Sequence, residues 1–390
     1  MKHRILLASL FLLVISFASA QAQTYTITDL GSLAPTAINS WAEVVGNQNG
    51  HGFVWARGWG KHDLGLLPGG TSSYAASIND RGAVTGTADG IGTVVSPDPS
   101  ESPSAECSDL TQPFIWTPKN GMKGLGAIEI ETFYGEFTAK DWCQFEPFYG
   151  SGINDRGQIV GYTSDYPDLY QWGFLWTSTG GISIFGDSWI DTLAYGINNS
   201  GEIVGQNGSS IEVAHATAWI NNVSTDLGTL DTGEVNPNVV SSSAAGVNDR
   251  GQIVGWSNFP PFSPPPFSPP CTPYSGCPMH AVLWTKTGTI RDLGTLPGDS
   301  LSVAVAINLF GEVIGASGNS AVWQGPTGST VEVIGRPFIW SASNGMQDLN
   351  TLIPVGGWVL NSVSDINVWG QIVGSGTLNG ESHGFLLTPQ

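Results

Sequence analysis

Residues 153–161 read Ile-Asn-Asp-Arg-Gly-Gln-Ile-Val-Gly, and variants of this phrase occur seven times along the chain. The other copies cover residues 38–46, 78–86, 197–205, 247–255, 307–315 and 366–374. Each has an Ile-Asn or Val-Asn pair, a turn, and a short apolar run that ends in glycine. A β-type unit repeated at this spacing is typical of one closed array of similar sheets, not of several unrelated domains.

Each repeat divides into four strand-like pieces. The first ends at the Ile-Asn pair, the second follows the turn, the third ends at a tryptophan, and the fourth reads Asp-Leu-Gly-Thr-Leu or a variant of it. Small or polar residues alternate with branched apolar ones, as in short strands of a packed sheet. Asn, Asp and Gly between the first two pieces favour a tight turn. Four strands joined in this way form one blade of a β-propeller.

The pieces predict seven blades and a specific way of closing the ring. The first copy of the fourth piece, at Asp29, precedes the first Ile-Asn pair, and the last repeat stops after its third piece. We therefore predict an all-β, seven-bladed propeller over residues 21–390, in which the segment near Leu30 pairs with the segment near Phe385 and completes the last blade. The third piece ends at Trp55, Trp116, Trp176, Trp219, Trp284, Trp340 and Leu387.

The lengths of the connections distinguish the two ends of the ring. The Ile-Asn turns keep a constant length, whereas the second-to-third and blade-to-blade connections vary widely. In an up-and-down blade these two variable connections lie at the same end. We call that end the variable face, and the end that carries the Ile-Asn turns the short-turn face. Because loops on a rigid scaffold commonly carry binding or catalysis, the variable face is the predicted functional face.

Three insertions dominate the variable face, at residues 87–112, 129–149 and 256–279, and they contain all four cysteines. Two disulfides are the simplest interpretation for a secreted chain, and of the three possible pairings we prefer Cys107–Cys143 with Cys271–Cys277. A zinc site is the alternative, although no histidine is spaced nearby. The proline-rich run before Cys271 indicates a stiff loop with polyproline geometry, or else a recognition motif.

The start of the chain has the pattern of a cleaved secretory signal. Residues 1–20 combine a basic start, an apolar stretch and a small-residue end. No other segment approaches 18 consecutive apolar residues, so we expect a secreted, extracellular or cell-surface protein without stable membrane insertion. The formal net charge of −19 repels phosphate backbones and argues against a nucleic-acid partner.

Taken together, the recurring phrases resemble the HAF repeat of bacterial extracellular proteins. The family's His-Ala-Phe triplet has counterparts that begin at His51, His215, His280 and His383. Its Asp-Leu-Gly-Thr-Leu-Pro-Gly-Gly phrase has counterparts at residues 63–70 and 292–299. The resemblance covers essentially the whole mature chain and implies an exported repeat protein. It implies no shared activity and supplies no catalytic residues.

No residue is assigned a catalytic role. Histidines that recur in four blades indicate a structural function, His3 leaves with the signal, and His62 lies on the short-turn face. Carboxylates on the variable face could serve glycoside cleavage, although a solvated acidic rim is the simpler interpretation. The turns lack the oxygen-rich alternation of a calcium loop, so no metal or other cofactor is predicted. The carboxylates are Glu129, Glu131, Glu136, Asp141, Glu146, Asp165, Asp168, Asp187 and Asp191.

Aromatic residues in the variable loops give the main functional indication. Flat apolar rings with polar edges suit sugars or protein partners, unless the rings pack on one another as a plain lid. We predict a non-catalytic binding module for an extracellular glycan or exported protein. The alternatives are a carbohydrate-active hydrolase or lyase that uses loop carboxylates, and a structural cell-surface or matrix component. The ligand-binding candidates are Trp142, Phe145, Tyr149, Tyr170, Trp172, Trp189 and Trp256.

Overall fold

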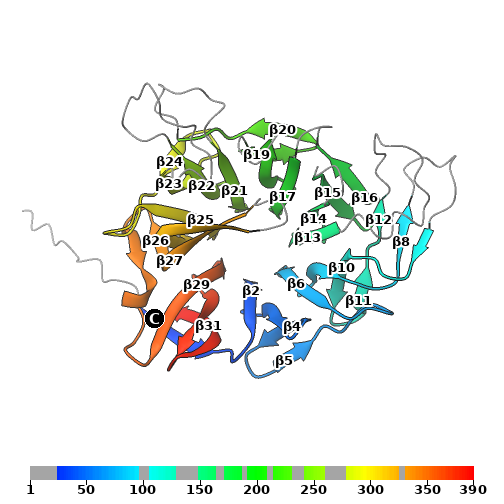
Figure 1. Ribbon diagram of the computed structural model, residues 1–390, viewed down its shortest axis with the longest axis horizontal. Coiled ribbons are helices and arrows are strands. Elements are labelled where there is room, and N and C mark those ends of the chain that lie inside the picture. Colours follow the sequence, from blue (N-terminus) through cyan, green and yellow to red (C-terminus); the bar gives the residue numbers. More distant parts are fainter. Residues whose placement is uncertain are drawn as a thin grey trace, which may run out of the picture.

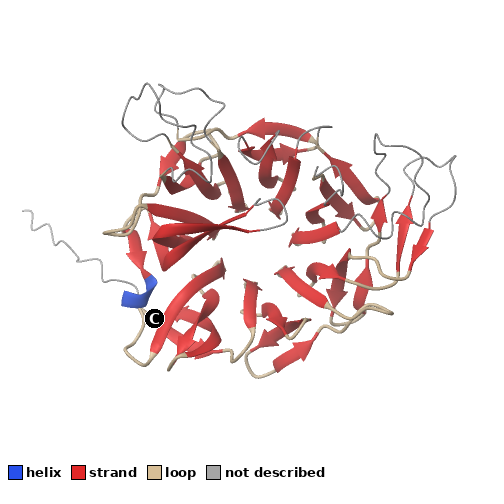
Figure 2. Ribbon diagram, viewed as in Figure 1, coloured by secondary structure: helices blue, strands red, loops and turns tan. Residues whose placement is uncertain are grey.

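The computed structural model is a ring of four-stranded antiparallel blades around a central axis (Figures 1 and 2). It describes residues 24–95, 105–128, 148–163, 171–186, 191–208, 214–230, 241–259, 278–324 and 330–390. Seven such blades are present, so the predicted seven-bladed propeller is confirmed. Within these ranges no helix is long and apolar enough to cross a membrane. The predicted signal, residues 1–20, lies outside them.

Each blade runs from an inner strand beside the axis to an outer strand at the rim (Figure 1). Blades 1 and 2 comprise β2 (Ala34–Ile38), β3 (Val44–Gln48), β4 (His51–Ala56) and β5 (Gly60–Asp63), then β6 (Ser73–Ile78), β7 (Val84–Ala88), β10 (Gln112–Thr117) and β11 (Gly121–Gly124). Blades 3 and 4 comprise β13 (Phe148–Ile153), β14 (Ile159–Thr163), β15 (Gly173–Thr177) and β16 (Gly181–Phe185), then β17 (Asp191–Ile197), β18 (Ile203–Gly208), β19 (Ala214–Ile220) and β20 (Val223–Asp226). Blades 5 and 6 comprise β21 (Ser242–Val247), β22 (Ile253–Asn258), β23 (Met279–Trp284) and β24 (Ile290–Asp292), then β25 (Leu301–Ile307), β26 (Val313–Gln324), β27 (Thr330–Ser341) and β28 (Gly345–Asp348).

Blade 7 closes the ring with strands from both ends of the chain. It comprises β29 (Trp358–Ile366), β30 (Ile372–Leu378), β31 (Glu381–Pro389) and, as its outer strand, β1 (Tyr25–Asp29). Asp29 pairs with Phe385 in the antiparallel register, and the Leu30 N–H donates to the Gly384 carbonyl at 2.9 Å. The predicted closure is confirmed. Because β1 pairs with β31, blade 7 has four strands like the other blades, and the outer edge of β31 is not left unpaired.

A small separate sheet lies at the rim of the ring, and two of its three strands belong to the first insertion. Its strands are β8 (Gly92–Val95), β9 (Ala105–Cys107) and β12 (Ala127–Ile128), in the order β12-β8-β9. Cys107 is buried and is not a free thiol. Cys143, Cys271 and Cys277 lie outside the described residues, so both disulfide pairings remain predictions.

The insertions are shorter than the sequence indicated, because the strands extend beyond the repeated phrases. Residues 87–88 belong to β7, residues 148–149 to β13, and residues 256–258 to β22. The structure also has an elaboration that the sequence analysis missed. Strands β26 and β27 have 12 residues each and stay paired from Val313–Trp340 out to Gln324–Thr330. This long hairpin covers part of blade 5, as described below.

Apolar side chains between neighbouring blades form the core. Between blades 3 and 4, for example, Val160 and Phe185 pack with Ala194, Ile203 and Trp219. Burial of each such large side chain stabilises the fold by about 2 kcal/mol. Because every blade packs on two neighbours, the ring holds its inner strands and their turns in fixed positions.

Candidate functional site

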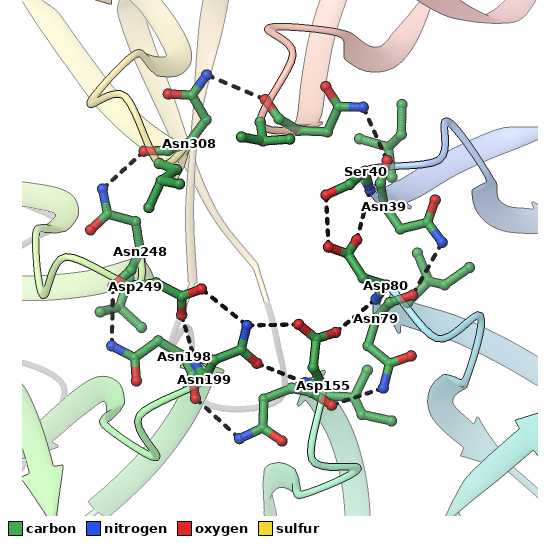
Figure 3. Close-up of a pocket in the computed structure, with 18 of the residues that line it drawn as sticks. Asn39, Ser40, Asn79, Asp80, Asp155, Asn198, Asn199, Asn248, Asp249 and Asn308 are labelled. Atoms are coloured by element: carbon green, nitrogen blue, oxygen red, sulfur yellow. Dashed lines mark hydrogen bonds between the residues drawn. The ribbon is translucent and has the colours of Figure 1, made fainter.

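The repeated asparagine forms a closed ring of hydrogen bonds at the centre of the short-turn face. The side-chain amide of each asparagine donates to the backbone carbonyl of the asparagine in the next blade, at 2.8–3.2 Å (Figure 3). The bond from Asn367 to Asn39 closes the ring across 328 residues of chain. All seven side chains are buried. The ring consists of Asn39, Asn79, Asn154, Asn198, Asn248, Asn308 and Asn367.

Each asparagine also holds its own turn. The Asn154 Oδ1 accepts from the N–H groups of Arg156 and Gln158, both at 3.0 Å, and its Nδ2 donates to the Gln158 side chain at 2.8 Å. Only an amide both donates and accepts in this way, so aspartate could not replace it. Gly157 closes the turn with a φ of +75°, which glycine adopts at little cost. The sequence pattern indicates only a turn former at this position, although the presence of the asparagine in all seven copies is a signal of a larger role.

A funnel of about 210 Å³ opens on the short-turn face inside this ring (Figure 3). Its wall includes the residue that follows each ring asparagine, and the five of these from Ser40 to Asp249 are hydrogen-bonded in sequence. Asp80 accepts from the Ser40 N–H and hydroxyl at 2.8 and 2.7 Å, and its own N–H donates to Asp155 at 2.9 Å. The remaining members are Asn199, Asp249, Leu309 and Val368.

The polar part of the funnel wall is a short acidic ladder. The Asn199 side-chain amide donates to Asp155 at 2.7 Å and to Asp249 at 3.0 Å. The Asn199 N–H also donates to Asp249, at 2.8 Å. Leu309 and Val368 form the apolar part of the wall. No group of three or more side chains suited to holding a metal ion occurs in the described part of the chain.

The histidines of the HAF-like phrase pair with the aspartates of the Asp-Leu-Gly phrase on the variable face. The Nδ1–carboxylate distances are 2.8–2.9 Å. The same carboxylate accepts from the glycine N–H two residues later, as Asp226 does from Gly228. The bond from His215 lowers the pKa of Asp226, despite partial burial. The pairs are His51–Asp63, His215–Asp226, His280–Asp292 and His383–Asp29. The histidine of one recurring phrase and the aspartate of the other thus form a single repeated contact.

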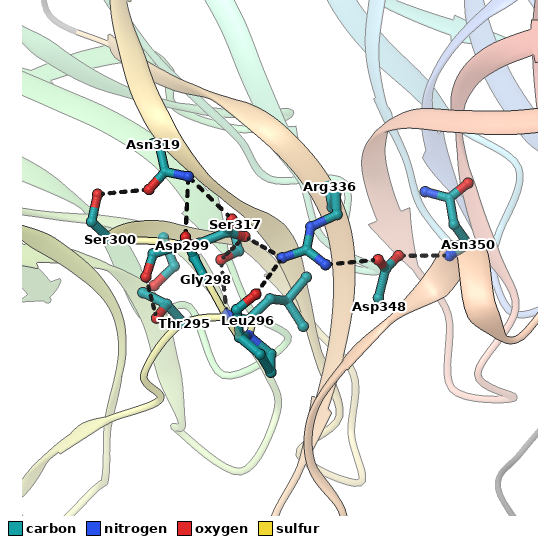
Figure 4. Close-up of polar contacts among 12 residues, drawn as sticks. Thr295, Leu296, Gly298, Asp299, Ser300, Ser317, Asn319, Arg336, Asp348 and Asn350 are labelled. Carbon is teal, nitrogen blue, oxygen red and sulfur yellow. Dashed lines mark hydrogen bonds and ion pairs between the residues drawn. The ribbon is translucent and has the colours of Figure 1, made fainter.

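Blade 6 replaces this histidine with an arginine. Arg336 contacts Asp348 at 3.2 Å and Asp299 at 2.9 Å (Figure 4). The Arg336 guanidinium also donates to the Pro297 carbonyl at 3.1 Å, and Asp299 accepts from the Ser317 hydroxyl at 2.9 Å. Both carboxylates are nearly buried, so the guanidinium is their main charge partner. This network fixes the blade 5–blade 6 connection against the hairpin.

Three of the predicted ligand-binding residues lie in the described part of the chain. Trp256 in β22 is only 8% exposed and packs with Met279, Val303 and Val333. Little of the Trp256 side chain is therefore exposed to a ligand, and two members of its cluster, Val303 and Val333, come from blade 6. Trp172 is half-buried against the core between blades 2 and 3. Trp142, Phe145, Tyr170 and Trp189 lie outside the described residues, as do all the predicted carboxylates except Asp191.

Tyr149, the third described candidate, belongs to a cluster of tyrosines beside the axis. Its ring lies 5.3 Å from that of Tyr162, which in turn meets Tyr195 edge-on at 6.2 Å. Burial raises the pKa of Tyr162, and the neighbouring Tyr149 and Tyr74 raise it further. Tyr74 in β6 is 53% exposed. Tyr74, Tyr149 and Tyr162 lie at the variable-face ends of their strands, and we call them, with Tyr195, the tyrosine cluster.

Two carboxyl groups near the axis hold their protons unusually firmly. Burial raises the pKa of Asp191 to about 6, against the effect of a bond from the Gln171 N–H. Asp191 begins β17 on the variable face and also raises the pKa of Tyr195. Burial likewise raises the pKa of Asp365 to about 7. Asp365 accepts from the Ile38 N–H at 2.9 Å and so joins blade 7 to blade 1.

The class of protein is thus a seven-bladed β-propeller with one face of uniform turns and one elaborated face. No family model and no curated protein sequence matches the chain. Among solved structures, a catalytically inactive virginiamycin B lyase from Staphylococcus aureus with quinupristin is similar at 10% identity and a TM-score of 0.49, covering 93% of this chain and 99% of that one. A streptogramin B lyase structure is similar at 10% identity and a TM-score of 0.49, and the match covers 94% of this chain and 98% of that one.

A peptidase gives a weaker likeness. The acylaminoacyl peptidase of Pyrococcus horikoshii is similar at 9% identity and a TM-score of 0.42, covering 89% of this chain and 49% of that one. At such identities and scores, none of these likenesses assigns an activity or a family.

Proposed function

We propose that the protein is an exported, non-catalytic binding module of the HAF-repeat type, and that its variable face binds an extracellular glycan. The observation that carries this proposal is the tyrosine cluster. Tyr74, Tyr149 and Tyr162 come from two adjacent blades and lie at the variable-face end of the axis, next to the bases of the long insertions. Tyrosine rings offer flat apolar surface to a sugar, and their hydroxyls offer hydrogen bonds.

The sequence supports the rest of the proposal. The signal-like start favours export, and the net charge of −19 disfavours anionic partners such as nucleic acids. An exported protein could use the same face, since exposed aromatic surface also serves protein partners. A glycan is preferred because tyrosine hydroxyls and Asp191 give the face hydrogen-bonding groups beside the rings.

The test is glycan binding by paired variants. Binding of polysaccharides and cell-wall fractions would be followed by isothermal calorimetry for wild type, Tyr149→Ala and Tyr74→Ala. Both variants should weaken binding at least fivefold, whereas Trp59→Ala, on the short-turn face, should leave it unchanged. If the wild type binds a glycan and neither tyrosine variant weakens that binding, the tyrosine cluster is not the glycan-binding site.

A second candidate function is a carbohydrate-active hydrolase or lyase, favoured by Asp191. A carboxyl group with a pKa of about 6 is close to neutrality, where general acids and bases work best. In that case wild type would degrade a polysaccharide and Asp191→Asn would lose the activity. Asp365→Asn is the matched control. The pKa of Asp365 is also raised, but this residue lies in blade 7, away from Asp191, so its replacement should not affect the activity. Our main proposal expects no turnover from any of the three proteins.

A third candidate, a structural cell-surface or matrix component, predicts self-association without ligand uptake. Sedimentation of the purified protein over a hundredfold range of concentration distinguishes it from both other candidates.

A further inference from the structure

Three exposed aromatic rings occur on the short-turn face, each one residue after a member of the funnel wall and away from the tyrosine cluster. Phe310 is 62% exposed, Trp369 is 67% exposed and Trp41 is 75% exposed. Each stands two residues after a ring asparagine, and they come from three consecutive blades, 6, 7 and 1. The same position in the other blades holds Arg81, Arg156, Ser200 and Arg250. The face therefore divides into an aromatic arc and a polar arc.

The two tryptophans of the aromatic arc are fixed in place by the next blade. The Trp41 Nε1–H donates to the Asp80 carbonyl at 2.9 Å, and the Trp369 Nε1–H donates to the Ser40 carbonyl at 2.9 Å. The single polar atom of each indole is thus satisfied within the protein, while most of the ring remains in solvent. A ring held in this way loses little conformational entropy when a ligand stacks on it.

A hydrogen-bonding residue of the funnel holds the Trp41 ring. Asp80, whose carbonyl holds Trp41, presents a carboxylate bonded to Ser40 (Figure 3). A carboxylate oxygen accepts two hydrogen bonds, and each oxygen of Asp80 accepts one from Ser40. Spare acceptor capacity therefore remains on the residue whose carbonyl holds Trp41. Asp155 and Asp249 extend this row of acceptors along the funnel wall.

We propose that the aromatic arc and the funnel together form a binding site for a saccharide without acidic groups. The apolar face of a pyranose ring would stack on Trp41 or Trp369, while its hydroxyls would donate to Asp80 and Asp155. Among the described residues, the funnel lining contains three carboxylates and no arginine or lysine, the arginines of the polar arc standing one residue further along each turn. The funnel therefore repels uronic, sulfated and phosphorylated sugars and favours neutral or amino sugars. An apolar protein segment fits less well, because it would leave these carboxylates desolvated and unpaired.

The experiment measures binding of cellohexaose, mannohexaose, a glucosamine oligomer and oligogalacturonate by calorimetry and tryptophan fluorescence. At least one neutral or amino oligosaccharide should bind, and oligogalacturonate should not. Trp41→Ala and Trp369→Ala should each weaken that binding tenfold or more. Trp41→Phe keeps a ring and should lose less than threefold.

A tryptophan on the same face provides the matched control. Trp59 is 50% exposed but stacks on His62 at 3.8 Å, in the turn between β4 and β5. Trp59→Ala should leave the affinity within twofold of wild type. Unchanged melting temperatures of the variants, whose altered side chains are all exposed, would show that the fold is retained.

The outcomes separate this site from the one on the variable face. Binding abolished by Tyr149→Ala but unaffected by Trp41→Ala and Trp369→Ala would overturn the inference and leave the proposed function standing. The reverse pattern would support the inference and reject the variable face. If no saccharide binds and Trp41→Ala abolishes self-association, the arc is a contact between copies of the chain, which also overturns the inference.

Discussion

The two faces of the ring are built in opposite ways. On the short-turn face, one nine-residue phrase in seven copies forms a closed ring of asparagine hydrogen bonds, and only the side chains beside that ring differ between blades. On the variable face, the His–Asp contact recurs in four blades, but the connections around it differ in length and form. A backbone that is uniform from blade to blade therefore does not imply a uniform surface. A turn of fixed length presents its variable side chains, such as Trp41 and Trp369, at fixed positions.

The largest effect should come from breaking the asparagine ring. Asn198→Ala removes five hydrogen bonds, including those to Glu202 and to the Asn248 carbonyl. Because the partner groups are left buried or poorly solvated, we expect the free energy of unfolding to fall by about 3 kcal/mol. Guanidinium denaturation measures it. Ser224→Ala, exposed in β20 of the same blade, should cost less than about 0.5 kcal/mol. A loss below about 1 kcal/mol for Asn198→Ala would show that the ring does not hold the short-turn face together.

The corresponding test on the variable face is Arg336→Met. The side chains of Asp299 and Asp348 are only 9% and 14% exposed, so removal of the guanidinium leaves two poorly solvated carboxylates without their cation. We expect a loss of about 2 kcal/mol, less than for a fully buried pair because Arg336 is itself partly exposed. Lys123→Met, at an exposed position of β11, is the control and should be nearly neutral. Equal stability of Arg336→Met and Lys123→Met would show that the network contributes nothing.

A smaller, pH-dependent effect should come from Asp191. Its pKa in the folded protein, about 6, exceeds that of the unfolded chain, about 3.9, so ionisation of Asp191 lowers stability as the pH rises between these values. Asp191→Asn should therefore stabilise the protein by roughly 1 kcal/mol at pH 8, allowing for partial solvent screening, and by nothing at pH 3.5. Thermal melts at both pH values measure it. Asp109→Asn, exposed beside β9, should show no such difference, and a gain for Asp191→Asn that is equal at both pH values would refute the proposed cause.

The smallest effect should come from the turn glycines. Gly157→Ala places a methyl group in open space, but at a φ of +75°, so it isolates backbone strain and should cost about 1 kcal/mol. The first repeat already accepts this cost, because Ala42 takes the same position with a φ of +60°. Gly356→Ala, in the blade 6–blade 7 connection and without positive φ, should be neutral or slightly stabilising. Equal destabilisation at Gly157 and Gly356 would mean that positive φ is not what the short-turn face requires of its glycines.

Much of the candidate site could not be predicted from the sequence. Trp256 follows a strand phrase at the base of an insertion and is therefore predicted to face a ligand, yet it is buried in a cluster that includes Val303 and Val333 from the next blade. Trp41 and Trp369 lie inside the repeated phrase, whose pattern does not distinguish them as functional candidates. They are nevertheless the most exposed tryptophans among the described residues. In each case the deciding neighbour comes from another blade, which no local pattern identifies.

The architecture follows from the amino-acid sequence alone: the number of blades, the pairing of β1 with β31, and the existence of two unlike faces. These follow from local periodicity, turn chemistry and the order of the pieces, all of which are short-range properties of the chain. Only the tertiary structure decided what the asparagines, histidines and tryptophans do. The amide of Asn79 finds its partner 75 residues away, and His383 finds Asp29 at 354 residues. Which ring is covered and which amide is satisfied depends on the neighbouring blade, and the blades become neighbours only when the ring closes.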